Sequence, residues 1–371
     1  MRKLTTLRKV NDLQPIKNAD LIELATVDGW NCIVKKGEFE VGDVGVYFEI
    51  DSMLPSTDER FSFLAGRGER KVDGIVHYRI RTMKMRGEIS QGLVLPVKLF
   101  PEITDSVDDI ENTIEEREDF SEMLGIVKYE RPEPQAPNAS GNFPSFLKKT
   151  DEERIQNIYG KISEKYKDVY FTPTLKLDGS STTIASVDRE RYGDHYSHDE
   201  ESVLSTFEID GVVYDVIVCS RNLQIKKNQD SHFIKSLLNG DMVNKIEELT
   251  HYLDRSVAIS GECMGMGIQG NPENFDRFKF FAFNIWDIEE RNYVPFSISV
   301  DLFELFQINM VPILHEPFKP FEYFSDLSEM LKYSDGKSIN AKNREGIVYK
   351  SDDYGSFKVI SNKWLLDSKN A

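Results

Sequence analysis

The chain has 371 residues, enough for two domains, and its 40% hydrophobic and 29% charged residues are ordinary for a globular protein. Its formal net charge of -17 argues against a protein that coats nucleic acid through an overall positive field, but leaves room for a local basic groove. Its three cysteines are odd in number and scattered, so we expect neither a disulfide framework nor a zinc site.

Signals for a membrane or for export are not evident in the sequence. No apolar run approaches the ~20 residues that a membrane-spanning helix needs. Residues 1–7 lack the apolar stretch of a signal peptide. We therefore expect a cytoplasmic protein with no membrane partner.

The first part of the chain, residues 1–130, has the pattern of a small β-domain. Short apolar runs at 22–27, 31–34 and 44–50 are separated by turn signals such as Asp28-Gly29 and Lys36-Gly37. Short strands at this spacing, without long helical periods between them, favour a small closed barrel. An OB-like β-barrel is the first choice.

The run from Tyr78 to Gly87 is basic and reads as one strand. Regular alternation would place Arg79 and Arg81 on one face and Lys84 and Arg86 on the other, whereas a bulge near Thr82 would bring all four together. These four cations are candidates for nucleic-acid binding. The alternative is a solvated edge strand whose charges resist aggregation.

Acidic residues are concentrated just before a proline-rich stretch. Residues 105–133 hold eleven acidic and three basic side chains, a net charge of -8. Prolines and small polar residues then predict an extended linker at 131–142. We place the domain boundary there, so that a second domain would cover 143–371.

The second domain mixes helical and strand patterns. A helix is predicted to begin at Asp151, with Thr150 as its cap and Glu153 completing a capping box. Strands are predicted at 171–177, 212–219, 257–261, 278–285 and 346–349. This mixture indicates an α+β fold.

The tetrapeptide Lys176-Leu177-Asp178-Gly179 stands out within this domain. Alternating apolar residues before an Asp-Gly turn would hold Lys176 at a strand end, where its amine could face a bound phosphate. Taken alone, the tetrapeptide also fits a solvated lysine beside a hairpin turn. Its meaning depends on the segments that follow it.

Six segments, in this order, resemble the motifs of the covalent nucleotidyltransferases, the superfamily of DNA ligases, RNA ligases and mRNA capping enzymes. They are 176–179, 220–222, 259–262, 278–285, 344–350 and 356–360. An OB domain ahead of the transferase domain, together with the stretches 90–96, 143–157 and 356–363, is similar to the RNA ligases of the Deinococcus and Naegleria type. This likeness implies a C-terminal adenylyltransferase domain with ATP-grasp-like antiparallel sheets and flanking helices.

The resemblance implies an ATP-dependent RNA ligase that acts in RNA repair. Lys176 would attack the α-phosphorus of ATP to form lysyl-AMP, AMP would pass to an RNA 5′-phosphate, and a 3′-hydroxyl would then displace it. The expected partner is RNA with 3′-hydroxyl and 5′-phosphate ends, with a nicked duplex as the favoured form. A free lysine has a pKa of about 10.4, so Lys176 needs surroundings that lower its pKa; we expect Lys350, Lys358 and a divalent metal to do so.

The resemblance also assigns the remaining site residues. Mg²⁺ or Mn²⁺ would be held, largely through water, by Asp178, Glu262 and Glu345. Phe283 would stack on adenine, with Phe281 on the same strand face and the other phenylalanines in the core. The expected nucleotide contacts are Arg154, Thr174, Leu175, Arg221, Glu262, Phe283, Glu345, Lys350 and Lys358, and Arg221 could also touch the nucleic acid.

Two departures from the family pattern affect specificity. Thr174 stands where many relatives have a glutamate that reads the adenine amino group, so adenine selection would fall to the threonine hydroxyl and to backbone groups. The last motif has Lys358 but Ile360 in place of a second lysine, whose phosphate contact is lost or taken by Lys363.

Two other functions fit parts of the pattern. One is another nucleotidyltransferase, either a DNA ligase or a capping-type guanylyltransferase. The other is a non-catalytic RNA-binding protein with an OB module and an inactive transferase fold. The presence of Lys176 together with Glu262 and Glu345 counts against the second alternative.

Overall fold

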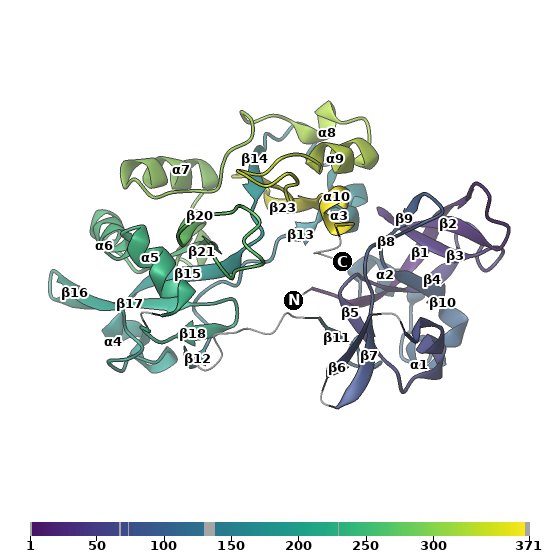
Figure 1. Ribbon diagram of the computed structural model, residues 1–371, viewed down its shortest axis with the longest axis horizontal. Helices are drawn as coiled ribbons and strands as arrows, with labels where there is room; N and C mark the ends of the chain where they lie inside the picture. Colours follow the sequence, from purple (N-terminus) through teal and green to yellow (C-terminus); the bar gives the residue numbers. More distant parts are fainter. Residues whose placement is uncertain (1, 67, 73, 130–137, 229, 368–371) are drawn as a thin grey trace. The chain divides into compact units, whose positions relative to one another are not determined.

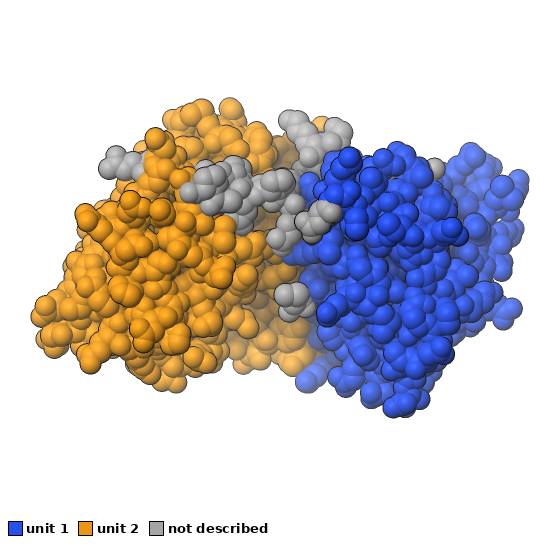
Figure 2. All heavy atoms as spheres, turned by 90° about the horizontal axis from the view of Figure 1, so that it is seen from below, with its two compact units in different colours: residues 1–132, 153–165, 365–371 blue, residues 133–152, 166–364 orange. Residues whose placement is uncertain are grey.

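The structure is a computed structural model that describes residues 2–66, 68–72, 74–129, 138–228 and 230–367. The chain divides into two compact units (Figure 2). Unit 1 contains residues 1–132, 153–165 and 365–371, and unit 2 contains residues 133–152 and 166–364. Much of the predicted linker, residues 131–137, lies outside the described residues, whereas Ala139–Asn142 forms strand β12 in unit 2.

Unit 1 contains the predicted small barrel. Its main sheet has the order β10-β4-β1-β2-β3 (Figure 1). The two ends of this order, β10 and β3, contact each other, so the sheet curls back on itself. The strands are β1 (Thr5–Pro15), β2 (Ile22–Val27), β3 (Trp30–Lys35), β4 (Val44–Phe48) and β10 (Leu93–Pro96).

The barrel closes around an apolar core. Trp30 and Tyr47 are fully buried and stack, with ring centroids 6.1 Å apart. Strand β1 carries a bulge between Val10 and Asp12, so its first half pairs with β4 and its second half pairs with β2. A bulged strand of this kind bends and lets one strand serve both sides of a barrel.

Smaller elements complete unit 1. A second sheet has the order β11-β5-β7-β6, and β8 and β9 form a separate hairpin. Their bounds are β5 (Ser52–Pro55), β6 (Glu69–Val72), β7 (Ile75–Arg79), β8 (Met83–Met85), β9 (Glu88–Ser90) and β11 (Val127–Lys128). The helical elements are η1 (Glu59–Leu64), η2 (Val97–Leu99), α1 (Pro101–Thr104), α2 (Ile110–Glu116) and α3 (Ile155–Ile162).

The acidic segment folds against the barrel. Asp109 caps helix α2 by accepting a hydrogen bond from the Asn112 amide at 3.1 Å. Glu111 pairs with Lys9 on β1 at 2.6 Å, and the Asp119 carboxylate accepts from the backbone amide of Thr5. Part of the acidity therefore fastens this segment to the first strand.

The helix predicted to begin at Asp151 begins instead at Ile155. Residues 151 and 152 have no regular structure, and Glu153–Arg154 forms the short strand β13. The predicted capping box is wrong. The Asp151 carboxylate forms ion pairs with distant side chains, and the Glu153 carboxylate accepts a hydrogen bond from the side chain of Asn157 at 2.5 Å.

Unit 2 is built on antiparallel sheets, as the resemblance implied. The large sheet has the order β12-β18-β17-β15-β19-β20-β21, with β16 also pairing to β17. Its further strands are β15 (Ser180–Asp188), β16 (Ser205–Ile209), β17 (Val212–Cys219), β18 (Leu223–Ile225), β19 (Val257–Met264), β20 (Lys279–Asp287) and β21 (Asn292–Tyr293). A second sheet contains β14 (Thr172–Lys176), β22 (Gly346–Ser351) and β23 (Gly355–Ile360).

Helices flank these sheets and bury their apolar faces. Helices α5 and α6 pack on the large sheet through Phe233, Leu237 and Ile246. A separate cluster around Phe146 and Tyr192 contains Ala185 and Ile217 of the same sheet. The helices of this part are α4 (Arg189–Tyr192), α5 (His232–Asn239), α6 (Met242–Leu253), α7 (Phe296–Leu305), α8 (Pro320–Tyr323), α9 (Leu327–Ser334) and α10 (Asn362–Leu365), with η4 (Gly193–His195).

Two sequence expectations concern the chain as a whole. Cys32, Cys219 and Cys263 are buried free thiols. Within the described ranges, the structure contains no helix with the length and hydrophobicity that a bilayer crossing demands. The mixed α+β architecture agrees with the predicted fold class.

Candidate active site

Three lysines of unit 2 share one face of the smaller sheet. Strand β14 pairs Lys176 with Gly346 of β22, and β22 pairs Val348 with Lys358 of β23. Directly opposed residues of antiparallel strands lie on the same face, and so do residues two or four positions apart along a strand. Lys176, Lys350 and Lys358 therefore project to one side.

The opposite face of this sheet is an aromatic core. Tyr349 and Phe357 are fully buried and stack with ring centroids 5.1 Å apart. Phe171 packs against Phe357 at 5.2 Å. This core fixes the sheet, so the three lysines stand on a rigid support.

The predicted position of Lys176 at a strand end is confirmed, since it is the last residue of β14. The following Asp-Gly is not a hairpin turn, because β14 and β15 lie in different sheets. A side chain at Gly179 would collide with the carbonyl oxygen of Cys263 and the sulfur of Met264. Glycine therefore lets the chain pass close to β19, where the Gly179 amide donates to Glu262 Oε1 at 3.1 Å.

Carboxylates surround the Lys176 amine. Its Nζ lies 2.8 Å from Oε2 of Glu345. Burial lowers the pKa of Lys176, but the charges of Glu345, Glu262 and Asp178 and the hydrogen bond to Glu345 outweigh burial and raise it. The charged groups that act most strongly on this amine are thus carboxylates, and the lowering of its pKa by Lys350, Lys358 and a divalent metal stays a prediction.

The same carboxylates suit a divalent cation. Burial and the neighbouring Glu345 and Asp178 raise the pKa of Glu262 to about 8, although Lys176 opposes this rise. This half-buried cluster of three carboxylates and one lysine carries surplus negative charge, and carboxylate oxygen is the ligand type that Mg²⁺ and Mn²⁺ prefer. In the described part of the chain no group of three or more acidic, histidine or cysteine side chains is close enough to hold a metal directly. The residues fit a cation bound partly through water.

Lys350 is buried among aromatic rings. Its side chain is 4% exposed, and its Nζ lies 5.5 Å from the Phe283 ring centroid and 5.2 Å from that of Phe296. Burial lowers the pKa of Lys350 to about 8, while Glu152 acts in the opposite direction. The amine donates to Asn284 Oδ1 at 2.5 Å.

A β-bulge places both Phe283 and Asn284 toward the site. Ser260 of β19 pairs with Asn284, but its neighbour Gly261 pairs with Ala282, so Phe283 is an extra residue in β20. A bulge lets two successive side chains face the same side. Phe283 and Phe281 pack against a cluster that contains Leu175 and Leu177, while Phe280 belongs to the core of the large sheet. Both candidate stacking rings therefore line the site, and adenine stacking stays a prediction.

Thr174 lies on β14, opposite Val348 of β22, and is buried. Its hydroxyl donates a hydrogen bond to the Val348 carbonyl at 3.0 Å. The hydroxyl hydrogen is therefore not available to a ligand, but the hydroxyl oxygen can still accept a hydrogen bond. The Leu175 amide donates to the carbonyl of Pro312 at 2.8 Å. An amino group of a base could use only the acceptor side of Thr174.

Lys358 and Arg221 meet at one carboxylate. Lys358 Nζ lies 2.8 Å from Asp151 Oδ1, and Arg221 Nη2 lies 3.3 Å from Asp151 Oδ2. Arg221 sits in the turn between β17 and β18. Lys363, the suggested substitute for a second motif lysine, lies 3.6 Å from Asp335.

The other predicted cations belong to unit 1. Arg154 is buried, with Trp30 beneath its guanidinium at 5.7 Å, and its Nε and Nη1 have no hydrogen-bond partner among the described residues. Arg79 ends β7, pairs with Asp51 at 2.8 Å and lies 3.9 Å from the Tyr129 ring centroid. The roles predicted for both arginines stay predictions.

The predicted continuous strand through Arg79, Arg81, Lys84 and Arg86 is wrong. Strand β7 stops at Arg79, and Met83–Met85 forms the separate strand β8. Arg86 has a φ of 54° and, with Gly87, makes the turn between β8 and β9. Lys84 and Arg86 are exposed, whereas Arg81 is half-buried.

Sequence reasoning missed three residues of this site. Asn284 binds Lys350, Asp151 bridges Lys358 and Arg221, and Glu152 acts electrostatically on Lys350. From the sequence, Asp151 and Glu152 were predicted to form the first turn of a helix. The residue pattern of β20 gave no indication of its bulge. The available signal was the acidic pair itself, which lies within the stretch 143–157 that resembles the RNA ligases.

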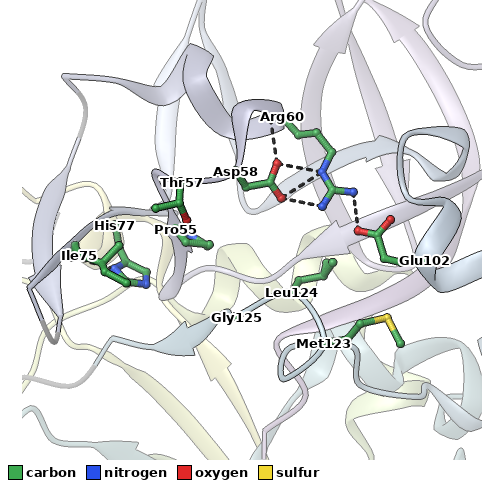
Figure 3. A pocket seen from close by; sticks show the side chains of 10 residues that line it. All are labelled: Pro55, Thr57, Asp58, Arg60, Ile75, His77, Glu102, Met123, Leu124 and Gly125. Carbon is green, nitrogen blue, oxygen red and sulfur yellow. Dashed lines mark hydrogen bonds and ion pairs between the residues drawn. The ribbon is translucent and has the colours of Figure 1, made fainter.

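A hollow of about 470 Å³ lies elsewhere, in unit 1 (Figure 3). Arg60 crosses it between Asp58 and Glu102, each 2.6 Å away. Apolar side chains including Ile75, Met123 and Leu124 line the rest. Its cation is already neutralised, and the predicted nucleotide-site residues do not line it.

Comparisons with known proteins agree with this arrangement. The family model for RNA ligase matches residues 169–364, and a model described as an OB-fold domain matches residues 4–97. A structure of a Naegleria gruberi RNA ligase mutant with AMP and Mn is 33% identical, with a TM-score of 0.83 and 100% of both chains covered. Another mutant of that ligase, with ATP and Mn, is 32% identical with a TM-score of 0.82 and 100% of both chains covered.

A third structure, Naegleria gruberi RNA ligase with PPi, is 33% identical with a TM-score of 0.82 and 100% of both chains covered. A comparison with curated proteins gave no match.

Proposed function

The chain belongs to the RNA ligase family, and on that premise we propose that this ATP-dependent RNA ligase joins 3′-hydroxyl and 5′-phosphate RNA ends through a lysyl-AMP intermediate on Lys176. The observation that carries the proposal is the position of Lys176 at the end of strand β14. Its amine lies among carboxylates, and its side chain is on the same sheet face as those of Lys350 and Lys358.

Lys176 would act as the nucleophile of the first step. Its Nζ, after losing a proton, attacks the α-phosphorus of ATP; an N–P bond forms, and the bond to pyrophosphate breaks. The carboxylates of Glu345, Glu262 and Asp178 raise the pKa of this amine. Adenylylation therefore requires that the negative charge of these carboxylates be offset.

The carboxylates give a divalent cation its place. Asp178, Glu262 and Glu345 would hold Mg²⁺ or Mn²⁺, largely through water, and the bound cation would lower the pKa of the lysine and offset charge on the α-phosphate. ATP and a divalent metal are the bound species of the related Naegleria enzyme. We infer the same pair for this chain.

Residues of β14, β20, β22 and β23 would bind the nucleotide. Phe283 offers an aromatic face for adenine, and the Thr174 oxygen offers an acceptor for the adenine amino group. Lys350 and Lys358 would bind phosphate oxygens, since ammonium groups on a fixed sheet stabilise charge that develops during transfer.

The later steps use the same residues. An oxygen of the RNA 5′-phosphate attacks the phosphorus of lysyl-AMP, and the N–P bond breaks, returning the amine of Lys176. The RNA 3′-hydroxyl then attacks the 5′-phosphorus, loses its proton and expels AMP, which completes the phosphodiester. Arg221 in unit 2, and Arg79, Arg81, Lys84 and Arg86 in unit 1, are the proposed RNA contacts, with Arg154 near the AMP phosphate.

Two measurements test the proposal. With α-³²P-ATP and Mg²⁺ or Mn²⁺, the wild type should gain a label that survives denaturation, and the Lys176→Ala variant should gain none. Absence of label on the wild type, with GTP as a control nucleotide, would refute the lysyl-AMP step.

The substrate is tested separately with nicked duplexes whose 3′-hydroxyl strand is RNA or DNA. Sealing of the RNA strand is expected. Sealing restricted to a DNA 3′-hydroxyl strand would overturn the assignment to RNA ends.

A further inference from the structure

One carboxylate joins two cations that the proposed function assigns to nucleotide or RNA contacts. Asp151 gives one oxygen to Lys358 at 2.8 Å and its other oxygen to Arg221 at 3.3 Å. All three residues belong to unit 2. The carboxylate thus spans β23 and the turn that follows β17.

The next residue, Glu152, also acts on a lysine of the proposed phosphate site. Glu152 raises the pKa of Lys350 against the effect of burial, so its carboxylate lies within electrostatic reach of that amine. Lys350 and Lys358 share one sheet face through the β22–β23 register. Two consecutive acidic residues therefore accompany two lysines of the proposed phosphate site.

The contact made by Asp151 has the form of a phosphate contact. A phosphate presents several negatively charged oxygens, and lysine and arginine donors bind them separately as they bind the two oxygens of this carboxylate. The side chain of Lys358 is 13% exposed and that of Asp151 is 34% exposed, so the pair is only partly shielded from water. A partly exposed ion pair is weak enough for a stronger anion to replace it.

The backbone at this position permits such a replacement. Residues 151 and 152 belong to no helix or strand. The preceding segment is held nearby, because Lys149 donates to the Asn222 side chain at 3.1 Å and the Phe143 amide donates to the Asn222 carbonyl at 3.0 Å. The side chain of Asp151 can leave its partners without disrupting a regular element.

We propose that Asp151 occupies the place of a substrate phosphate between Lys358 and Arg221, and that it sets the affinity of the ligase for phosphate by competing for these two cations. The inference rests on the proposed function, which gives Lys358 and Arg221 their ligands. The ligand is a phosphate group, supplied either by the triphosphate of ATP or by the 5′-end of the RNA.

The direct test measures binding of inorganic pyrophosphate to the full chain by calorimetry, without added metal. Asp151→Asn should bind pyrophosphate about twofold to fivefold more tightly than wild type, the range that a weak ion pair accounts for. Asp151→Glu, which keeps the charge, should show no such gain. Asp168→Asn is the matched control, because it removes the same charge beside Lys319, 3.1 Å away in the same unit.

A double-mutant cycle locates the effect. In a Lys358→Ala background the gain from Asp151→Asn should shrink or vanish, because the two residues interact directly. Thermal melting of each variant shows that it is folded. Equal or weaker pyrophosphate binding by a folded Asp151→Asn protein would overturn the proposal, as would a gain that persists unchanged without Lys358.

Two further arms identify the source of the phosphate. A lower KM for ATP in lysyl-AMP formation by Asp151→Asn points to the triphosphate, whereas tighter binding of nicked RNA with a 5′-phosphate, but not with a 5′-hydroxyl, points to the RNA end. The absence of both gains would overturn the proposal. If the wild type formed no lysyl-AMP, the proposed function would fail, while the pyrophosphate measurement would still test the competition by itself.

Discussion

The structure predicts that the pKa of Lys176 depends on the neighbouring Glu345. Replacing Glu345 by Gln removes the carboxylate 2.8 Å from the amine and keeps the shape of the side chain. Two unit charges about 4 Å apart interact by about 4 kcal/mol at an effective dielectric constant of 20, which equals about 3 pKa units. Because the Lys176 side chain is 25% exposed, solvent screening reduces the expected fall in pKa to about 1–2 units.

The fall can be measured without any catalytic assay. Reductive methylation of the metal-free protein at a series of pH values, read by mass spectrometry, reports the fraction of Lys176 that is unprotonated. The wild-type amine, with its raised pKa, should react only at high pH, and the reaction midpoint should fall in the Glu345→Gln variant. Glu201→Gln, which removes a carboxylate beside Lys226 instead, should leave the Lys176 midpoint unchanged. An unchanged midpoint in Glu345→Gln would refute the reasoning that carboxylates control this amine.

Three further predictions address neighbouring residues. The pKa of Lys350 falls to about 8 on folding, so between pH 8 and about 10.5 the unfolded chain binds more protons than the folded one. The free energy of unfolding should therefore rise by about 1–3 kcal/mol as pH rises through that window. Urea unfolding at pH 7.5 and 9.5 should show this gain in the wild type and a smaller one in Lys350→Met. Gly179→Ala should destabilise unit 2 by about 1–3 kcal/mol in the same unfolding assay, because its methyl group meets the Cys263 carbonyl; unchanged stability would show that the close approach is not needed. Phe283→Ala should raise the KM for ATP more than Phe281→Ala, and the reverse order would assign stacking to Phe281.

Local patterns in the sequence predicted the strand that carries Lys176. Its period-2 alternation ends at an Asp-Gly pair, and this information lies within ten residues. The contact to Glu345 spans 169 positions, and only the resemblance to a known family brought the two residues together. Local pattern gives strands and their ends, whereas pairing of distant strands needs knowledge of the fold.

The errors also have physical causes. The basic strand was predicted to continue past Arg79, but Asp51 and Tyr129 capture that side chain and the strand ends there. The helix was predicted four residues too early, because the acidic residues that suit a first helical turn bind distant cations instead. The bulge at Phe283 had no local signal, since it depends on how β19 and β20 pair. In each case a tertiary contact overrode local preference.

The path of the chain limits how this protein can be divided. It passes between the two units after residues 132, 152, 165 and 364, so the short segment 153–165 belongs to unit 1 although both of its neighbours in sequence belong to unit 2. Within unit 1 this segment is anchored by Asn157, which accepts from the Trp30 indole at 2.7 Å and donates to Glu49 at 2.6 Å. A single cut at the predicted linker would therefore leave the barrel without α3, and would leave the remaining fragment with a helix whose buried residues have lost their partners. The two parts are interlaced in sequence, and a genetic exchange of one barrel for another would have to carry both segments together.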